Sequence, residues 1–136
     1  MNSIKKYTVF FVVGGVGYGL LELSWRGYTH PTMILAGGIC FVIFSLIADR
    51  LYTLPLIIKA ALAALCVTAV ELIFGLVFNL GLGLAVWDYT DRPLNLFGQI
   101  CLPFSLLWCA LGIVFIPIAE VINQKFGELR CLGAEK

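Results

Sequence analysis

Four long apolar runs constrain this sequence more than any other feature. They extend from about Tyr7 to Leu23, Thr32 to Ala48, Leu56 to Val86 and Leu96 to Ile122. A helix needs about 20 apolar residues to cross a bilayer, in which only helices and closed barrels satisfy every backbone group. No run alternates apolar and polar residues as a membrane β-strand does. We therefore expect one all-α membrane domain spanning residues 1–136, a polytopic four-transmembrane-helix bundle made of two helical hairpins.

Composition agrees with a membrane environment. Hydrophobic residues make up 61% of the 136 residues and charged residues 12%, whereas soluble domains average about 45–50% and 25%. A soluble domain of this size cannot bury so much apolar surface. The net charge of +1 offers no basic surface for nucleic acid, and the five cysteines form no C-x-x-C pair. We expect the lipid bilayer as solvent and no metal, cofactor or nucleic-acid partner.

The third run is too long for one straight span. As a continuous helix it would measure about 45 Å, against about 30 Å of hydrocarbon. It must tilt, break or extend beyond the bilayer. Because glycine weakens a helix interior, Gly81 and Gly83 are the favoured place for a break.

Basic residues predict the orientation. In a four-span arrangement seven of them fall on one side, namely Lys5, Lys6, Arg50, Lys59, Lys125, Arg130 and Lys136. Two fall on the other side, Arg26 and Arg92. This asymmetry predicts a multi-pass protein of the inner (plasma) membrane with both termini in the cytoplasm. Four aromatic residues in the outward loops then resemble interfacial anchors: Trp25, Tyr28, Trp87 and Tyr89.

Two carboxylates lie inside the apolar runs. Glu71 interrupts the third run and Glu22 the first. A carboxylate in hydrocarbon costs several kcal/mol unless it is paired, protonated or facing a polar cavity. In one interpretation they face an outward polar cavity that binds a proton, a cation or a positive substrate group. In the other they are structural, joining helices through hydrogen bonds worth about 0.6 kcal/mol on average.

Helix spacing groups the polar residues. Three sets share a face at i, i+4 spacing: Glu22 with Arg26, Glu71 with Gly75 and Asn79, and Asn95 with Gln99. All of them could converge in the outer half of the bilayer. The candidate substrate- or ion-binding residues are Glu71, Glu22, Asn95, Asp88, Gln99, Asn79, Arg26 and Arg92. Glu71 would be the ionisable site, Asn95 and Gln99 would line the cavity, and Arg26 or Arg92 would be a counter-ion. We expect no catalytic residues, and we interpret the single histidine, His30, as a loop residue.

Small residues predict close helix contact. The spacing Gly15-x-x-x-Gly19 lets backbones approach, and Gly37-Gly38 in the second run could receive it. The contact could lie within the bundle or between subunits. A homo-oligomer is expected, with a dimer favoured, because two copies could enclose a cavity that one cannot.

The two halves of the chain share a pattern. Glu22-Leu23 precedes a loop with tryptophan, tyrosine, threonine and proline, and Glu71-Leu72 precedes another. Both halves cross in the same direction, so a parallel repeat is one interpretation. Chance, together with the usual composition of membrane interfaces, is the other.

One motif carries a family resemblance. The motif is Trp87-Asp88-Tyr89-Thr90-x-x-Pro93-x-Asn95-x-x-Gly98-Gln99-Ile100, and Glu71-x-x-x-Gly75 lies upstream. The chain resembles, from about Gly19 to Trp108, the CmpB-like family labelled putative ABC-transporter type IV, which includes the transmembrane protein 229-like group. Thr90 stands where members often have serine. The resemblance implies a multi-pass bacterial inner-membrane protein. Alternatively, the motif is architectural, with Asp88 at a helix end, Pro93 forcing a turn and Asn95 capping the fourth helix.

The leading hypothesis is therefore a small transporter or channel-like membrane protein. The alternative is a non-transporting membrane subunit that binds a larger membrane complex. An enzyme is less favoured, because no nucleophile, base or metal set stands out. The chain has no G-x-x-x-x-G-K-[ST] motif, so an ABC mechanism would need a separate ATPase subunit.

Overall fold

The structure is all-helical. The computed structural model describes residues 3–134, with side chains up to residue 127. Its elements are α1 (Ser3–Arg26), α2 (Pro31–Arg50), α3 (Leu56–Phe74), the π-helix η1 (Gly75–Gly81) and α4 (Leu102–Ala134). Four segments are long and apolar enough to cross a membrane: Ser3–Arg26, Pro31–Arg50, Leu56–Gly81 and Leu102–Gly127. The predicted four-span membrane bundle is confirmed. Lys136 and the side chains of Arg130 and Cys131 lie outside the described residues.

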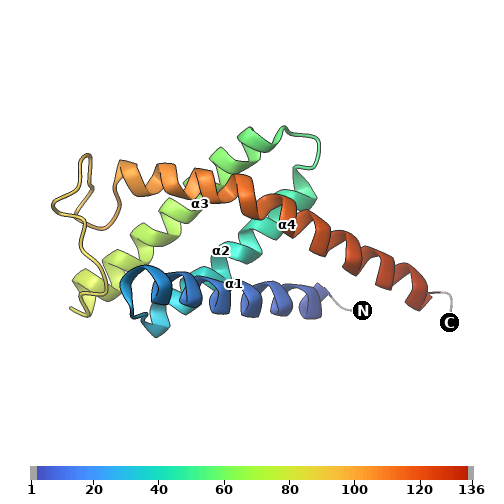
Figure 1. The fold of residues 1–136 in the computed structure, drawn as a ribbon, viewed down its shortest axis with the longest axis horizontal. Helices are drawn as coiled ribbons and strands as arrows, with labels where there is room; N and C mark the ends of the chain where they lie inside the picture. The colour runs from blue at the N-terminus through green and yellow to red at the C-terminus, as the bar shows by residue number, and fades with distance from the viewer. Residues whose placement is uncertain (1–2, 135–136) are drawn as a thin grey trace.

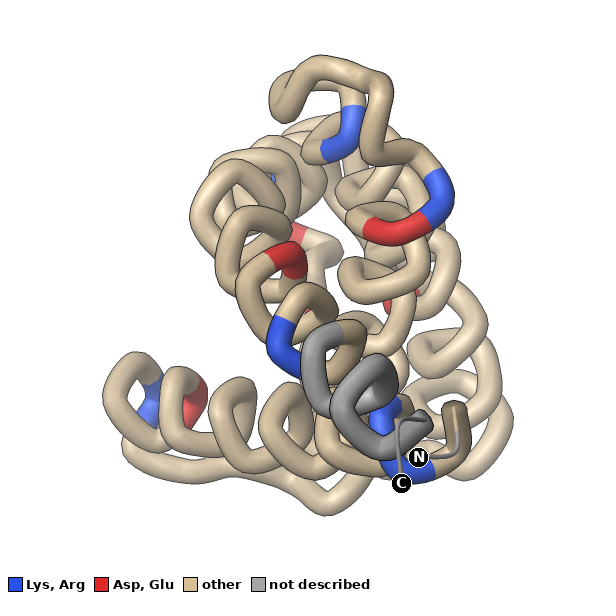
Figure 2. The backbone as a smooth tube through the Cα atoms, turned by 90° about the vertical axis from the view of Figure 1, so that its right-hand side faces the viewer, with Lys and Arg blue, Asp and Glu red and all other residues tan. Residues whose placement is uncertain are grey.

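The helices form two hairpins. α1 packs mainly on α2 and α3 mainly on α4, while α2 also contacts both α3 and α4. The turn at residues 27–30 and the loop at residues 82–101 lie together at one end, which we term the loop end (Figure 1). α1 begins and α4 finishes at the opposite end, which we term the termini end (Figure 1). Figure 2 shows that charged residues are sparse along the chain, as a lipid-facing surface requires.

Glycines set the distance between α1 and α2. A Cβ on Gly14 would lie 2.3 Å from Phe41 Cβ, and a Cβ on Gly37 would lie 2.4 Å from Tyr18 Cβ. Both distances are far below carbon contact, so only glycine allows this crossing. Close packing of α1 on α2 agrees with the prediction, but Gly14 is the glycine that meets Gly37, and Gly15 and Gly19 lie against Ile34. This packing leaves oligomerisation a separate question.

The third span ends where its glycines predicted a break. α3 continues into η1, which ends at Gly81, and Gly83 has a φ of +65°. The fourth helix differs from its prediction. It begins at Leu102 and not near Leu96, so Asn95 is not its N-cap. Phe97 and Gly98 have φ values of 54° and 66°, which a right-handed helix does not allow, and Pro103 then falls in the first turn, where its missing N–H has no helical partner to lose.

A polar layer joins the helices at the termini end. Lys6 pairs with Asp49 across α1 and α2, and the buried Lys59 of α3 pairs with Glu120 of α4. Toward the loop end the core becomes apolar and aromatic, with Phe10, Phe41, Phe44, Trp108 and Ile116 all buried. The functional candidates lie on the loop side of that core and share Trp108 with it.

Candidate functional site

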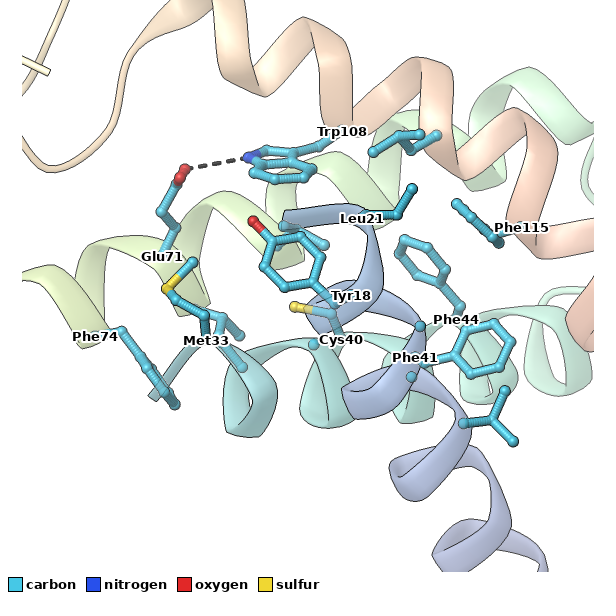
Figure 3. A pocket seen from close by; sticks show the side chains of 18 of the residues that line it. Tyr18, Leu21, Met33, Cys40, Phe41, Phe44, Glu71, Phe74, Trp108 and Phe115 are labelled. Carbon is cyan, nitrogen blue, oxygen red and sulfur yellow. Dashed lines mark hydrogen bonds between the residues drawn. The ribbon is translucent and has the colours of Figure 1, made fainter. Parts of the chain in front are cut away.

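Glu71 is held between the loop and α4. Its side chain is on α3, and the residue is 7% exposed. The Tyr89 hydroxyl donates to Glu71 Oε1 at 2.7 Å, and Trp108 Nε1 donates to Oε2 at 3.1 Å. Figure 3 shows the Trp108 indole directed at the carboxylate. Both oxygens are therefore oriented by donors from other elements.

Glu71 has no cationic partner among the described residues. The ion pairs there are Lys6 with Asp49, Arg26 with Glu22, and Lys59 with Glu120. The donors to Glu71 are a phenol and an indole, both neutral. A carboxylate in such surroundings is costly unless it binds a proton or a cation. Glu71 therefore differs from Glu22, whose charge Arg26 balances.

Tyr89 is fixed as a donor by its environment. Its ring stacks on Phe104 at the start of α4, with centroids 4.6 Å apart and planes 15° apart. Burial raises the pKa of the Tyr89 phenol far above its usual value, and the nearby charge of Glu71 adds to this effect. The hydroxyl consequently keeps its proton at physiological pH and donates it toward Glu71.

A pocket of about 380 Å³ lies beside Glu71. All four long helices contribute to its walls, together with Trp87 of the loop. Glu71 is the one charged residue among the described residues that line it, and the other walls are mostly aliphatic or aromatic. The Tyr18 ring lies in the pocket with its hydroxyl on the side of Glu71 and Trp108 (Figure 3).

Glu22 and Arg26 form the pair that their spacing predicted. Arg26 Nη2 donates to Glu22 Oε2, and Arg26 Nη1 donates to the Val86 carbonyl at 3.2 Å. The guanidinium also stacks over the Tyr28 ring, 4.7 Å from its centroid. This pair ties α1 to the long loop. Neither residue is among those that line the pocket.

Asn79 and Gln99 use their polar atoms to hold the long loop. Asn79 Nδ2 donates to Gln99 Oε1 at 2.8 Å and to the Trp87 carbonyl at 3.0 Å. Asn79 Oδ1 accepts from the Val86 N–H at 2.7 Å. Gly75 makes room for this contact, because a Cβ there would lie 2.7 Å from Gln99 Cβ. The predicted buried stripe of Glu71, Gly75 and Asn79 exists, but its amide supports the loop.

Asp88, Arg92 and Asn95 lie on the exposed part of the loop. Asp88 Oδ1 accepts from the Thr90 N–H at 2.9 Å. Asn95 Nδ2 donates to the carbonyls of Thr90 and Arg92 at 3.2 and 3.0 Å. Arg92 lies 5.9 Å from the ring centroid of Phe104. None of the three lines the pocket, so the structure does not gather them with Glu71.

The loop aromatics divide into two groups. Trp25 is 85% exposed and Tyr28 is 58% exposed, in keeping with interfacial anchors. Trp87 is buried, and its indole N–H donates to the Gln99 carbonyl at 2.9 Å. Tyr89 is directed toward Glu71. Treating these two residues as anchors was wrong, because the loop folds back onto α3 and α4.

His30 is the N-cap residue of α2. Its Nδ1 accepts from the Thr32 N–H at 3.2 Å and caps α2. This agrees with its interpretation as a loop residue.

Comparison with known protein families gives one match. Residues 8–131 match the family described as putative ABC-transporter type IV. The chain belongs to this family. Searches among curated proteins and solved structures gave no match. The matched range contains the whole of the pocket wall and both buried carboxylates, so these features belong to the family segment of the chain.

Sequence reasoning missed the two donors that hold Glu71 and the ion pair between Lys59 and Glu120. Trp108 gave a usable signal, because it lies well inside the fourth apolar run and far from either end. An indole N–H in hydrocarbon needs an acceptor, and a carboxylate in the neighbouring span can supply one. The role of Tyr89 depends on how the loop folds back, for which the sequence gives no local signal.

Proposed function

We propose that this protein is a small transporter or channel-like membrane protein whose ionisable site is Glu71. One observation carries the proposal. Glu71 is 7% exposed, accepts hydrogen bonds from neutral donors, and borders a pocket in which no other described residue is charged. An unpaired carboxylate inside a membrane domain marks a pathway or binding site for a proton or cation. The family description points to transport as well.

In this proposal the neighbours of Glu71 have distinct roles. Tyr89 and Trp108 orient the carboxylate, and the Tyr18 hydroxyl lies on the side of the pocket that faces Glu71 and Trp108 (Figure 3). The pair of Glu22 with Arg26 and the amides of Asn79 and Gln99 hold the long loop over the site. Cargo reaching Glu71 from the loop end would require this loop to move.

The test is a flux measurement in liposomes. Purified wild type should carry protons or monovalent cations in a fluorescence assay, and Glu71→Gln should lower the rate to that of empty liposomes. Asp49→Asn is the matched control, since it removes a carboxylate at the termini end, remote from the pocket. Equal flux in wild type and Glu71→Gln would refute the assignment of Glu71. All variants are compared for folding by size exclusion and circular dichroism.

A second candidate function is a non-transporting subunit of a larger membrane complex. The family description favours it, because an ABC mechanism needs an ATPase and the sequence contains no Walker A motif. Purification from native membranes would then recover an ATPase or another membrane protein in stoichiometric amount. Recovery of this chain alone, with Glu71-dependent flux, would support the transporter.

We further propose a homodimer in the inner membrane with both termini cytoplasmic. The asymmetry of basic residues supports the orientation, which puts the loop end outside. Large apolar side chains are exposed on every span and leave room for a second copy as well as for lipid. Mass measurement of the detergent-solubilised protein tests the dimer.

A further inference from the structure

We infer that the pocket beside Glu71 binds an organic cation with an apolar body. The charge lies against the carboxylate, and the body lies among the aromatic side chains. This inference rests on the proposed role of Glu71 as the ionisable site, and it names the class of ligand that the site accepts.

The charge of the ligand follows from the pocket wall. Glu71 is the one charged residue among the described residues of that wall, and no described cation pairs with it. Each of its oxygens accepts one hydrogen bond from a protein donor. A carboxylate offers about four lone-pair positions, so acceptor capacity remains for a ligand. A positive charge complements this wall, whereas an anion would meet repulsion.

The apolar body of the ligand follows from the remaining walls. Tyr18, Phe41, Phe115 and Trp108 present rings around the cavity (Figure 3). Aromatic faces attract cations within about 6 Å, and most strongly where water is excluded. The cavity of about 380 Å³ is within the size range of small-molecule sites, about 300–1,000 Å³. An organic cation therefore fits both the chemistry and the space.

Two other occupants fit less well. A divalent inorganic ion such as Ca²⁺ takes about 6–8 oxygen ligands, and no group of three His, Cys, Asp or Glu side chains that could hold a metal is found among the described residues. A neutral acyl chain would match the apolar wall. It would leave the Glu71 charge without a partner, and a desolvated charge is costly.

The experiment compares two probes of similar shape. Methyltriphenylphosphonium and triphenylphosphine oxide carry the same three phenyl rings, but the first is a cation and the second is neutral. Binding to the full-length protein in the neutral detergent dodecyl maltoside is measured by calorimetry and by quenching of tryptophan fluorescence. We expect wild type to bind the cation at least about tenfold more tightly than the oxide. Trp87 and Trp108 line the pocket and would report its occupancy.

Three variants locate the binding site. Glu71→Gln should weaken binding of the cation to the level of the oxide. Gly17→Leu should weaken binding of both probes, because Gly17 lines the pocket and an added Cβ meets nothing within 4 Å. Asp49→Asn should bind both probes as wild type does, since Asp49 lies at the termini end. Thermal unfolding of each variant confirms that the compared proteins are folded.

The outcomes separate this inference from the proposed function. Equal affinity for the two probes in wild type, or unchanged affinity for the cation in folded Glu71→Gln or Gly17→Leu, would overturn the inference. Binding in detergent requires no transport. Glu71-dependent binding without flux in liposomes would therefore retain the ligand site and reject transport. Glu71-dependent proton flux without binding of the phosphonium would retain transport and reject this ligand class.

Discussion

Gly37→Ala tests whether the helix crossing of the first hairpin depends on the missing side chain. The added Cβ would lie 2.4 Å from Tyr18 Cβ and 3.0 Å from the Gly14 carbonyl oxygen. Optimal carbon contacts are about 3.5–4.0 Å, so α1 must move away by about 1 Å or more. Such overpacking costs about 1–3 kcal/mol, partly offset by the roughly 1 kcal/mol that alanine gains over glycine in a helix. The net expectation is a loss of up to about 2 kcal/mol.

Gly17→Ala is the matched control for this prediction. Gly17 lies on α1 in the same hairpin, and a Cβ there meets nothing within 4 Å. The same chemical change should therefore leave stability unchanged or raise it by up to about 1 kcal/mol. Reversible unfolding by SDS in mixed micelles, followed by circular dichroism, measures both variants. If the two differ by less than about 0.5 kcal/mol, the crossing does not depend on close packing and the argument fails.

Three further predictions concern the loop, the termini end and the orientation. Tyr89→Phe keeps the ring stacked on Phe104 but removes the donor to Glu71. It should lower the free energy of unfolding in SDS by about 0.6–3 kcal/mol, and an unchanged value would mean that this hydrogen bond contributes nothing to stability. Lys59→Met breaks the ion pair with Glu120 and should destabilise the folded protein. The loss should be smaller than the roughly 3–5 kcal/mol typical of fully buried pairs, because the Glu120 side chain is 34% exposed. An unchanged thermal unfolding temperature would contradict this prediction. In intact cells a membrane-impermeant maleimide should label Trp25→Cys and leave the wild type unlabelled, because Trp25 is 85% exposed at the loop end. Labelling of Trp25→Cys only after the membrane is opened would reverse the proposed orientation.

The predictable features are those that depend on spacing along one helix. The span count follows from the lengths of the apolar runs, and the pair of Glu22 with Arg26 follows from i, i+4 geometry. Close packing of the first two spans followed from their glycines, although Gly14 meets Gly37 and the expected Gly15 and Gly19 lie against Ile34. Each of these inferences needed at most two neighbouring helices.

The remaining features depend on how the chain returns after Gly81. Asn95 was expected in the fourth helix, but its amide bonds the loop carbonyls of Thr90 and Arg92. Glu71 meets Trp108 only because α3 and α4 adopt one particular register. The periodicity of apolar residues in the sequence predicts neither of these contacts. The hydrogen bonds of an irregular loop depend on the path of the whole loop. The apolar nature of the pocket was therefore not foreseen, because the amides expected to line it are used elsewhere.

The hydrogen bond from Tyr89 to Glu71 has a consequence for regulation. It fastens the loop at residues 82–101 to the same carboxylate that is proposed to receive a cation. For a ligand that displaces the phenol from Oε1, and does not use the free acceptor positions, occupancy of the site and release of the loop are thermodynamically linked. Linkage is reciprocal. A neighbouring subunit that binds the loop in its closed position would lower the affinity for the ligand. The ligand would lower the affinity for that subunit by the same factor.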